Sequence, residues 1–287
     1  MTRKGALIVG IHTSIAGGLP SAVRSAVEKG CDAFQIFARN PRGWLARELA
    51  SDEVREFRDA REQSGLRPFA IHSIYLINLA AQDPFALARS RAAFRQEIMR
   101  GIELGAEYLV VHPGSPVQAP AEVGIQTAIE SIREAARGLN LNGLTILIEN
   151  TAGQGSAIGR DFEQVAEMVA ALDDLPIGVC LDTAHTFASG YDISTEAGLR
   201  KTIRSINRSF GFDRIKLIHC NDSKAPLGSR VDRHEHIGLG HIGEDAFRRL
   251  TGNLKFRRIP FILETPVDHE RDDRWNINRL RELSRGR

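Results

Sequence analysis

Histidine and acidic residues recur in this sequence at the ends of short apolar runs. His72, His112 and His219 each close such a run, and Glu149, Asp182 and Glu264 close three others. The same kind of residue follows in the loops after two of these runs, at His185, Asp232 and His234. Imidazole and carboxylate groups are ligands for zinc or manganese in hydrolytic sites. Because one ion takes three or four protein ligands, this set of nine predicts two or three metal ions.

Clusters of several metal ions recur in enzymes that hydrolyse phosphate esters. Each residue taken singly has a simpler interpretation, since a histidine after a strand often serves as a structural hydrogen-bonding group. An acidic residue in that place often caps the next helix, which is an alternative for Asp182 and Glu149. That interpretation would have to hold at all nine positions together, so the metal cluster is the better hypothesis.

The elements that carry these residues alternate regularly along the chain. Short apolar runs predict buried parallel strands at Ala6–His12, Ala33–Ala38, Pro68–His72, Tyr108–His112, Thr145–Glu149, Ile177–Asp182, Ile215–His219 and Ile259–Glu264. Helical spacing predicts helices at Leu19–Lys29, Asp52–Ser64, Pro84–Leu104, Ala121–Leu139, Asp161–Leu172, Thr195–Phe210, Glu244–Leu250 and Asp273–Leu283. Eight strand–helix units predict an α/β fold, a (β/α)8 TIM barrel, as a single catalytic domain over residues 1–287.

An open doubly wound sheet is the alternative fold, but no GxGxxG follows the first run and no P-loop is present. In a barrel, the C-terminal ends of the strands and the loops after them form the site. The predicted ligands all fall there, which places them at one mouth. His12, His236 and His241 fall on the same rim, and we expect them to be hydrogen-bonding residues there.

The composition is that of an ordinary globular protein, with 42% hydrophobic and 26% charged residues. A formal net charge of +2 neither requires nor excludes a polyanionic partner. Cys31, Cys180 and Cys220 lie in apolar runs, so we expect buried thiols rather than disulfides or metal ligands. No apolar run has the length of a membrane span or a signal peptide, so we expect a cytoplasmic protein.

The sequence segments around the predicted ligands resemble those of a known family. They are SIAGGL (14–19), FARNPRGW (37–44), HSIYLINLA (72–80), HPGS (112–115), IENTAGQGS (148–156), GVCLDTAHTFASGYD (178–192), HCNDSKAPLGSRVDRHEHIG (219–238) and LET (263–265). In this order, over almost the whole chain, they resemble endonuclease IV, the zinc-dependent apurinic/apyrimidinic (AP) endonuclease family of base excision repair.

The resemblance implies a trinuclear zinc mechanism, with three Zn²⁺ per chain and Mn²⁺ as an alternative at some sites. His72 and His112 would hold the first ion, with Glu149 bridging to the second. The remaining ligands would divide between the second ion (Asp182, His219 and Glu264) and the third (His185, Asp232 and His234). Glu149 would also be catalytic, by orienting the attacking hydroxide.

The implied reaction is hydrolysis of the phosphodiester 5′ to an abasic site in duplex DNA. It would leave a 3′-hydroxyl and a 5′-deoxyribose phosphate, and the same site would remove 3′-blocking groups. The partner would be double-stranded DNA, with no membrane, and we expect a monomer. Residues expected to contact DNA are Arg42, Tyr75, Leu76, Lys224, Arg230 and Arg233. For Leu76 and for Trp44 nearby, packing against the barrel is the alternative. Three zinc ions would raise the net charge to about +8 at the mouth.

Two positions depart from the family pattern: Ser73, where an acidic residue is usual, and Leu239, where glutamate is usual. Two other functions remain open. A sugar isomerase or epimerase on the same barrel would need about four metal ligands, which Glu149, Asp182, His219 and Glu264 could supply. It would leave the other five predicted ligands unexplained. A DNA-damage-binding protein without activity is the second alternative, and the complete ligand set argues against it.

Overall fold

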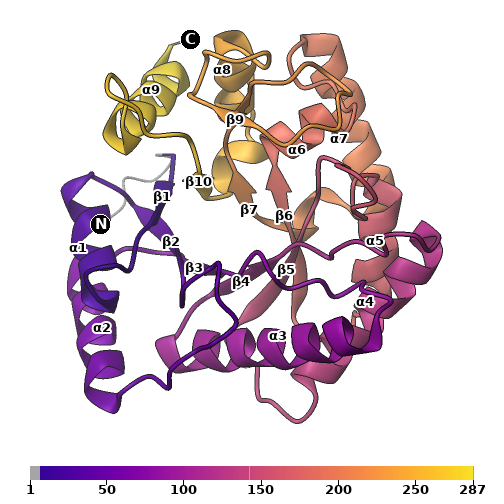
Figure 1. The fold of residues 1–287 in the computed structure, drawn as a ribbon. Coiled ribbons are helices and arrows are strands. Elements are labelled where there is room, and N and C mark those ends of the chain that lie inside the picture. The colour runs from indigo at the N-terminus through magenta and orange to yellow at the C-terminus, as the bar shows by residue number, and fades with distance from the viewer. Residues whose placement is uncertain (1–6, 142, 287) are drawn as a thin grey trace.

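A computed structural model of the protein describes residues 7–141 and 143–286 and contains a closed barrel of eight parallel strands (Figure 1). The strands are β1 (Val9–Thr13), β2 (Ala33–Phe37), β3 (Phe69–His72), β4 (Tyr108–Val111), β5 (Thr145–Glu149), β6 (Ile177–Asp182), β7 (Ile215–His219) and β10 (Phe261–Leu263). They follow one another around the barrel in chain order, and β1 pairs with β10 to close it. The predicted (β/α)8 barrel is confirmed.

Helices surround this barrel as an outer ring (Figure 1). They are α1 (Leu19–Glu28), α2 (Ser51–Ser64), α3 (Pro84–Leu104), α4 (Ala121–Ala136), α5 (Phe162–Ala171), α7 (Glu196–Ser209), α8 (Glu244–Gly252) and α9 (Asp273–Arg285). Short elements add α6 (Thr183–Ala188), a two-stranded sheet of β8 (Asp222–Ser223) and β9 (His234–Glu235), and 3₁₀ turns at Phe212–Arg214 and Phe256–Arg258. No helix of the described residues is long and apolar enough to cross a membrane.

The ends of α3 illustrate why the helices lie where the sequence predicts them. Asp83 accepts a hydrogen bond from the backbone N–H of Ala86 at 2.8 Å, and Pro84 occupies the first helical position. Gly105 ends the helix at φ 71°, a left-handed conformation that glycine adopts without the strain of a Cβ atom. Capping and termination signals in the sequence therefore fix this helix at both ends.

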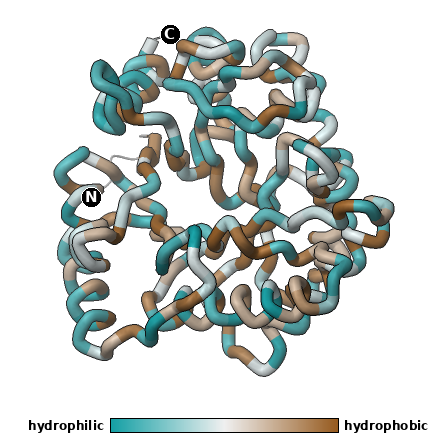
Figure 2. The backbone as a smooth tube through the Cα atoms, viewed as in Figure 1, coloured by the Kyte–Doolittle hydropathy of each residue, from teal (hydrophilic) through white to brown (hydrophobic). Residues whose placement is uncertain are grey.

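The hydrophobic core has two parts, one inside the barrel and one between the strands and the helices. The inner part comprises Ala33, Ala70, Val110, Leu147, Cys180, Leu217 and Ile262. The outer part contains the large buried aromatic residues, including Phe34 and Phe69, whose rings stack at 4.7 Å. The outer helices alternate between hydrophilic and hydrophobic residues along the chain (Figure 2), as expected for helices with one face on this core. All three cysteines are buried and free, as predicted.

The inner core determines where the polar side chains of the mouth lie. Side chains two residues apart on a strand point to the same face. Six residues of the inner core are each followed, two positions later, by one of the predicted ligands: His72, His112, Glu149, Asp182, His219 and Glu264. These six side chains therefore stand directly above the packed layer that fills the barrel, and we call them the strand-end ring.

Some predicted boundaries shift by a few residues. The first strand is Val9–Thr13 rather than Ala6–His12, and Ala6 lies outside the described residues. His112 and Glu264 are the first residues beyond β4 and β10 instead of their last residues. Strand ends at a barrel mouth lose their hydrogen-bond partners one residue at a time, so these shifts do not move the side chains off the rim.

Candidate metal centre

Glu149 lies at the centre of the mouth and is fully buried. Its Oε2 lies 3.2 Å from Nε2 of His72 and 3.2 Å from Nε2 of His112. Its Oε1 lies 2.9 Å from Nδ1 of His219 and 3.3 Å from Nδ1 of His185. Each oxygen thus faces two imidazoles on its own side, which is the arrangement that a carboxylate bridging two ions requires.

The potential ligand atoms form overlapping groups whose members lie within 4.8 Å of one another. One group is His72, His112 and Glu149, and a second is Glu149, Asp182, His219 and Glu264. A third joins Asp182, His185 and His234. Three groups that share Glu149 and Asp182 can hold neighbouring ions with these two carboxylates between them.

Asp232 belongs with the third group. Its Oδ2 lies 3.2 Å from Nε2 of His185, and its Oδ1 lies 3.4 Å from Nε2 of His234. The sequence placed His185 in a loop, but it lies in the short helix α6. Asp182 caps this helix by accepting a hydrogen bond from the backbone N–H of His185 at 2.7 Å. The capping role considered for Asp182 and its place in the ring therefore coexist, and the cap holds His185 toward the mouth.

The charges of these buried groups fit a cation. Burial opposes ionisation of Glu149, but the neighbouring imidazoles of His219 and His112 hold its pKa well below the usual range. Burial lowers the pKa of His185, but Asp182 and the other acidic groups nearby raise it well above its usual value. Nε2 of His234 is buried with no hydrogen-bond partner. Ionised carboxylates facing imidazoles, one of them with an unpaired nitrogen, make a donor set that suits zinc.

A second set of residues forms hydrogen bonds to the residues of the strand-end ring. Asn221 donates from Nδ2 to Oδ2 of Asp182 at 2.7 Å, and its Oδ1 accepts from the backbone N–H of Glu264 at 2.8 Å. Asn150 accepts from the backbone N–H of Asp182 at 2.8 Å. The most central supporting residue is Gln35 on β2, which is fully buried against His219 and Glu264. It follows the barrel-filling Ala33 by two positions, and this spacing is the sequence signal that could have found it.

The two departures from the family pattern leave the backbone contacts of the site in place. The carbonyl oxygen of Ser73 lies 2.7 Å from Nδ1 of His72, which leaves Nε2 of that ring for Glu149. Leu239 is partly exposed on a loop whose backbone binds Asp222. The Asp222 carboxylate accepts hydrogen bonds from the backbone N–H groups of Gly238, Gly240, Ile242 and Gly243.

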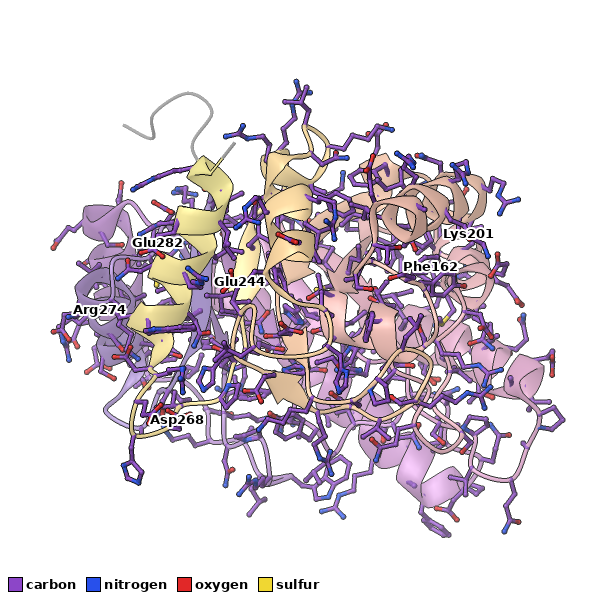
Figure 3. The ribbon with its side chains drawn as sticks, turned by 90° about the horizontal axis from the view of Figure 1, so that it is seen from above. Phe162, Lys201, Glu244, Asp268, Arg274 and Glu282 are labelled. Carbon is purple, nitrogen blue, oxygen red and sulfur yellow. The ribbon has the colours of Figure 1, made fainter. Side chains whose placement is uncertain are left out.

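The other rim histidines form hydrogen bonds or close polar contacts. Nδ1 of His12 lies 3.2 Å from Oε1 of Glu264. Nε2 of His236 lies 3.0 Å from Oδ2 of Asp268, a residue on the loop before α9 (Figure 3). His241 donates its backbone N–H to the carbonyl of Ser223 at 2.8 Å. These contacts connect the rim loops to the barrel.

A cavity of about 570 Å³ opens over the predicted ligands and is lined by His12, His72, His112, His185, Asp232, His234 and Glu264. Tyr75 stands at its edge with 65% of its surface exposed. The Tyr75 ring packs edge-on against the Phe37 ring, with 4.9 Å between the ring centroids, so Phe37 supports the exposed ring. Leu76 and Trp44 differ from Tyr75, because both are partly buried and pack against the core, as the alternative interpretation anticipated.

The basic residues expected to contact DNA lie exposed on the same rim. Arg42 is on the loop after β2, while Lys224, Arg230 and Arg233 are on the loop between β7 and α8. Arg233 lines a second cavity that shares His112, His185 and Asp232 with the first. Basic side chains thus flank the cluster from two sides.

Known proteins resemble this chain over most of its length. Residues 23–283 match the family described as xylose isomerase-like TIM barrel. A probable endonuclease 4 of Solibacter usitatus is 48% identical over 96% of both chains. Endonuclease IV of Thermus thermophilus matches with a TM-score of 0.84 and 39% identity, covering 96% of this chain and 98% of its own. A D-tagatose 3-epimerase-like protein, 17% identical over 96% of both chains, shares the fold at a TM-score of 0.69. With this barrel and these relatives, the chain belongs to the endonuclease IV family.

Proposed function

We propose that the protein is a metal-dependent AP endonuclease of base excision repair. It would hydrolyse the phosphodiester 5′ to an abasic site in duplex DNA. Water would add to phosphorus and the bond to the preceding 3′ oxygen would break, leaving a 3′-hydroxyl and a 5′-deoxyribose phosphate. The observation that carries this proposal is the convergence of nine imidazole and carboxylate side chains on one mouth, in a chain 48% identical to a probable endonuclease 4. Removal of 3′-blocking groups would use the same site.

Three zinc ions would suit the three groups of ligand atoms, with Mn²⁺ as an alternative at some of them. His72, His112 and Glu149 would hold the first; Glu149, Asp182, His219 and Glu264 the second; and His185, Asp232 and His234 the third. When bound, zinc would supply a strong nucleophile at neutral pH and stabilise the leaving oxygen. The two oxygens of Glu149 face different groups, which supports its role as the bridging residue that orients the nucleophile.

The DNA would lie across the exposed rim. Tyr75 is exposed and supported by Phe37, so it could stack on a base beside the abasic gap. Arg42 could enter the gap, and Leu76 would contact DNA with the part of its side chain that the core does not cover. Lys224, Arg230 and Arg233 would bind phosphates from the other side of the mouth. We expect a monomer that acts in the cytoplasm.

The test is a duplex oligonucleotide with one tetrahydrofuran abasic analogue, incubated with zinc-loaded protein. We expect a single cut on the 5′ side of the analogue and a 3′ end that a DNA polymerase can extend. An undamaged duplex of the same sequence is the control substrate. Zinc quantified on the same sample should approach three ions per chain.

Three outcomes would overturn parts of the proposal. No cut by protein that carries zinc would remove the endonuclease function. Binding to the abasic duplex without cleavage would favour a damage-recognition protein. About one ion per chain together with epimerisation of a ketose would favour the sugar epimerase alternative.

A further inference from the structure

Gln35 is a buried amide inside the ring of predicted ligands. It lies on β2, two positions after the barrel-filling Ala33, and none of its surface is exposed. It therefore occupies the place on β2 that predicted ligands occupy on or directly after six other strands of the barrel. An amide is a poor substitute for imidazole or carboxylate as a zinc ligand. A fully buried amide is costly unless hydrogen bonds satisfy it, so its contacts show what it does.

The contacts of Gln35 fix the orientation of its amide group. Nε2 lies 2.7 Å from Oε1 of Glu264, and Oε1 lies 3.0 Å from Nε2 of His219. An ionised carboxylate can only accept, so the amide nitrogen must face Glu264. The opposite orientation would place two oxygens 2.7 Å apart. The amide oxygen must then accept a hydrogen bond from Nε2–H of His219.

This orientation decides which nitrogen of His219 is available to a metal. With its proton on Nε2, the ring turns Nδ1 toward Oε1 of Glu149 at 2.9 Å and Oε2 of Glu264 at 3.3 Å. These are the oxygens of the second group of ligand atoms. Histidines that bind metals usually donate their other N–H to a fixed acceptor, which sets the tautomer and the direction of the ring.

The geometry points to Gln35 as the positioning residue of the second metal site. Its amide oxygen selects Nδ1 of His219 as the ligand atom, and its amide N–H orients the Glu264 carboxylate toward the same ion. The inference rests on the metal site of the proposed function and adds to it a residue that binds no metal itself. His12 completes the arrangement, because its Nδ1 lies 3.0 Å from Nε2 of Gln35.

Two substitutions separate the two contacts. Gln35→Met keeps the size of the side chain and removes both hydrogen bonds. Gln35→Glu keeps an acceptor opposite Nε2–H of His219 and removes the donor to Glu264. Ser131→Ala is the matched control, since Ser131 is fully buried on α4 and its hydroxyl bonds to the backbone carbonyls of Leu79 and Thr127 rather than to a predicted ligand.

The measurements are made on zinc-loaded protein and do not depend on DNA cleavage. Nitrogen-15 NMR of the histidine rings, with the His219 signals assigned by His219→Asn, reports which nitrogen carries the proton and which binds zinc. Competition with a chelator reports the zinc affinity of each variant. We expect Nε2–H and zinc-bound Nδ1 in the wild type and in Gln35→Glu, and loss of this pattern in Gln35→Met. In Gln35→Met the weakest-held zinc should bind roughly 10- to 100-fold less tightly, and Ser131→Ala should match the wild type.

A wild-type pattern and wild-type zinc affinity in Gln35→Met would overturn the inference while leaving the metal site intact. If His219 of the wild type showed no zinc signature, the metal assignment of the proposed function would fail instead. Should Gln35→Met not fold, Gln35→Glu decides, because loss of the Nε2–H pattern there would contradict the assigned role of the amide oxygen.

Discussion

The strand-end ring and the loop at 39–50 face the same mouth, but the fold holds them in different ways. Each ring residue comes two positions after a barrel-filling residue. It lies either on a hydrogen-bonded strand or directly after the end of one. The loop is neither helix nor strand. Two buried arginines bind its carbonyl groups: Arg39 donates to Trp44 at 3.0 Å, and Arg100 donates to Arg47.

The two regions depend on different interactions. The side chains of the strand-end ring contact one another and, in our proposal, bind metal ions. The loop depends on Arg39, whose Nε lies 2.6 Å from Oε1 of Glu97, with both side chains almost fully buried. Loss of a ring residue should therefore remove chemistry from a folded protein. Loss of the buried pair should weaken the fold and displace the loop while leaving the metal ligands in place.

The largest effect should come from the centre of the ring. Glu149→Gln keeps the shape of the side chain but removes the charge that faces four imidazoles. We expect cleavage of the abasic duplex to fall by roughly 10⁴-fold, the scale seen when a group that serves several steps is removed. Binding of the duplex, measured by fluorescence anisotropy, should persist. Turnover at more than a tenth of the wild-type rate would remove Glu149 from the assigned role.

For the loop at 39–50, we expect substitution of the buried pair to lower stability instead. Glu97→Gln leaves the buried guanidinium of Arg39 without a counter-charge, which should cost about 3 kcal/mol of unfolding free energy. Glu53→Gln is the matched control, because Glu53 pairs with Arg47, which is 66% exposed, and such pairs contribute about 1 kcal/mol or less. Urea unfolding of the zinc-loaded variants measures both. Equal losses in the two variants would show that the buried pair has no special place in the loop.

Substitution of Tyr75, at the edge of the cavity, tests the surface that we propose for DNA binding. Tyr75→Ala should weaken binding of the abasic duplex by about 1–3 kcal/mol, the usual contribution of a base stacked on an aromatic ring. The undamaged duplex should lose less affinity. Leu45→Ala is the control, since Leu45 is 94% exposed on the loop and has no predicted DNA contact. A similar loss in both variants would indicate general apolar contact rather than stacking at the gap.

The effect expected from a change of conditions alone is a dependence of stability on pH that metal should reverse. Burial lowers the pKa of His185 and His219, but the acidic groups around them raise both well above 6.5. A raised pKa in the folded state gives stability that is complete below about pH 6.5 and is lost as the pH rises through the folded value. Metal-free protein should therefore lose up to about 1.4 kcal/mol per pH unit for each proton released.

Zinc should give the opposite slope, because it binds the unprotonated rings and competes with protons. We expect the zinc-loaded protein to lose unfolding free energy as the pH falls below neutrality. Urea unfolding from pH 6 to 9, with and without a chelator, compares the two slopes. Identical slopes would mean that His185 and His219 do not bind the metal.

The sequence predicted the barrel and the mouth because both depend on local patterns. Apolar runs alternate with helical spacing, and polar residues at strand ends share a rim in any such barrel. The spacing after Ala33 could have placed Gln35 on the rim, but the partners of residues that make long-range contacts could not be predicted in this way. Gln35 and its partner His219 are 184 positions apart in the sequence, and Arg39 and its partner Glu97 on α3 are 58 positions apart. The helix α6 was missed because its six residues are too few to show a helical period.

The pairing of β1 with β10 has a consequence for when the site can exist during synthesis. His12 and Gln35 leave the ribosome early, whereas Glu264, which both of them contact, follows the last strand of the barrel. A chain that ends before Glu264 cannot assemble the second group of ligand atoms. A metal ion bound there would join the residue after the last strand, Glu264, to ligands on β5, β6 and β7. A partly made chain would therefore lack a complete hydrolytic centre until the barrel closes.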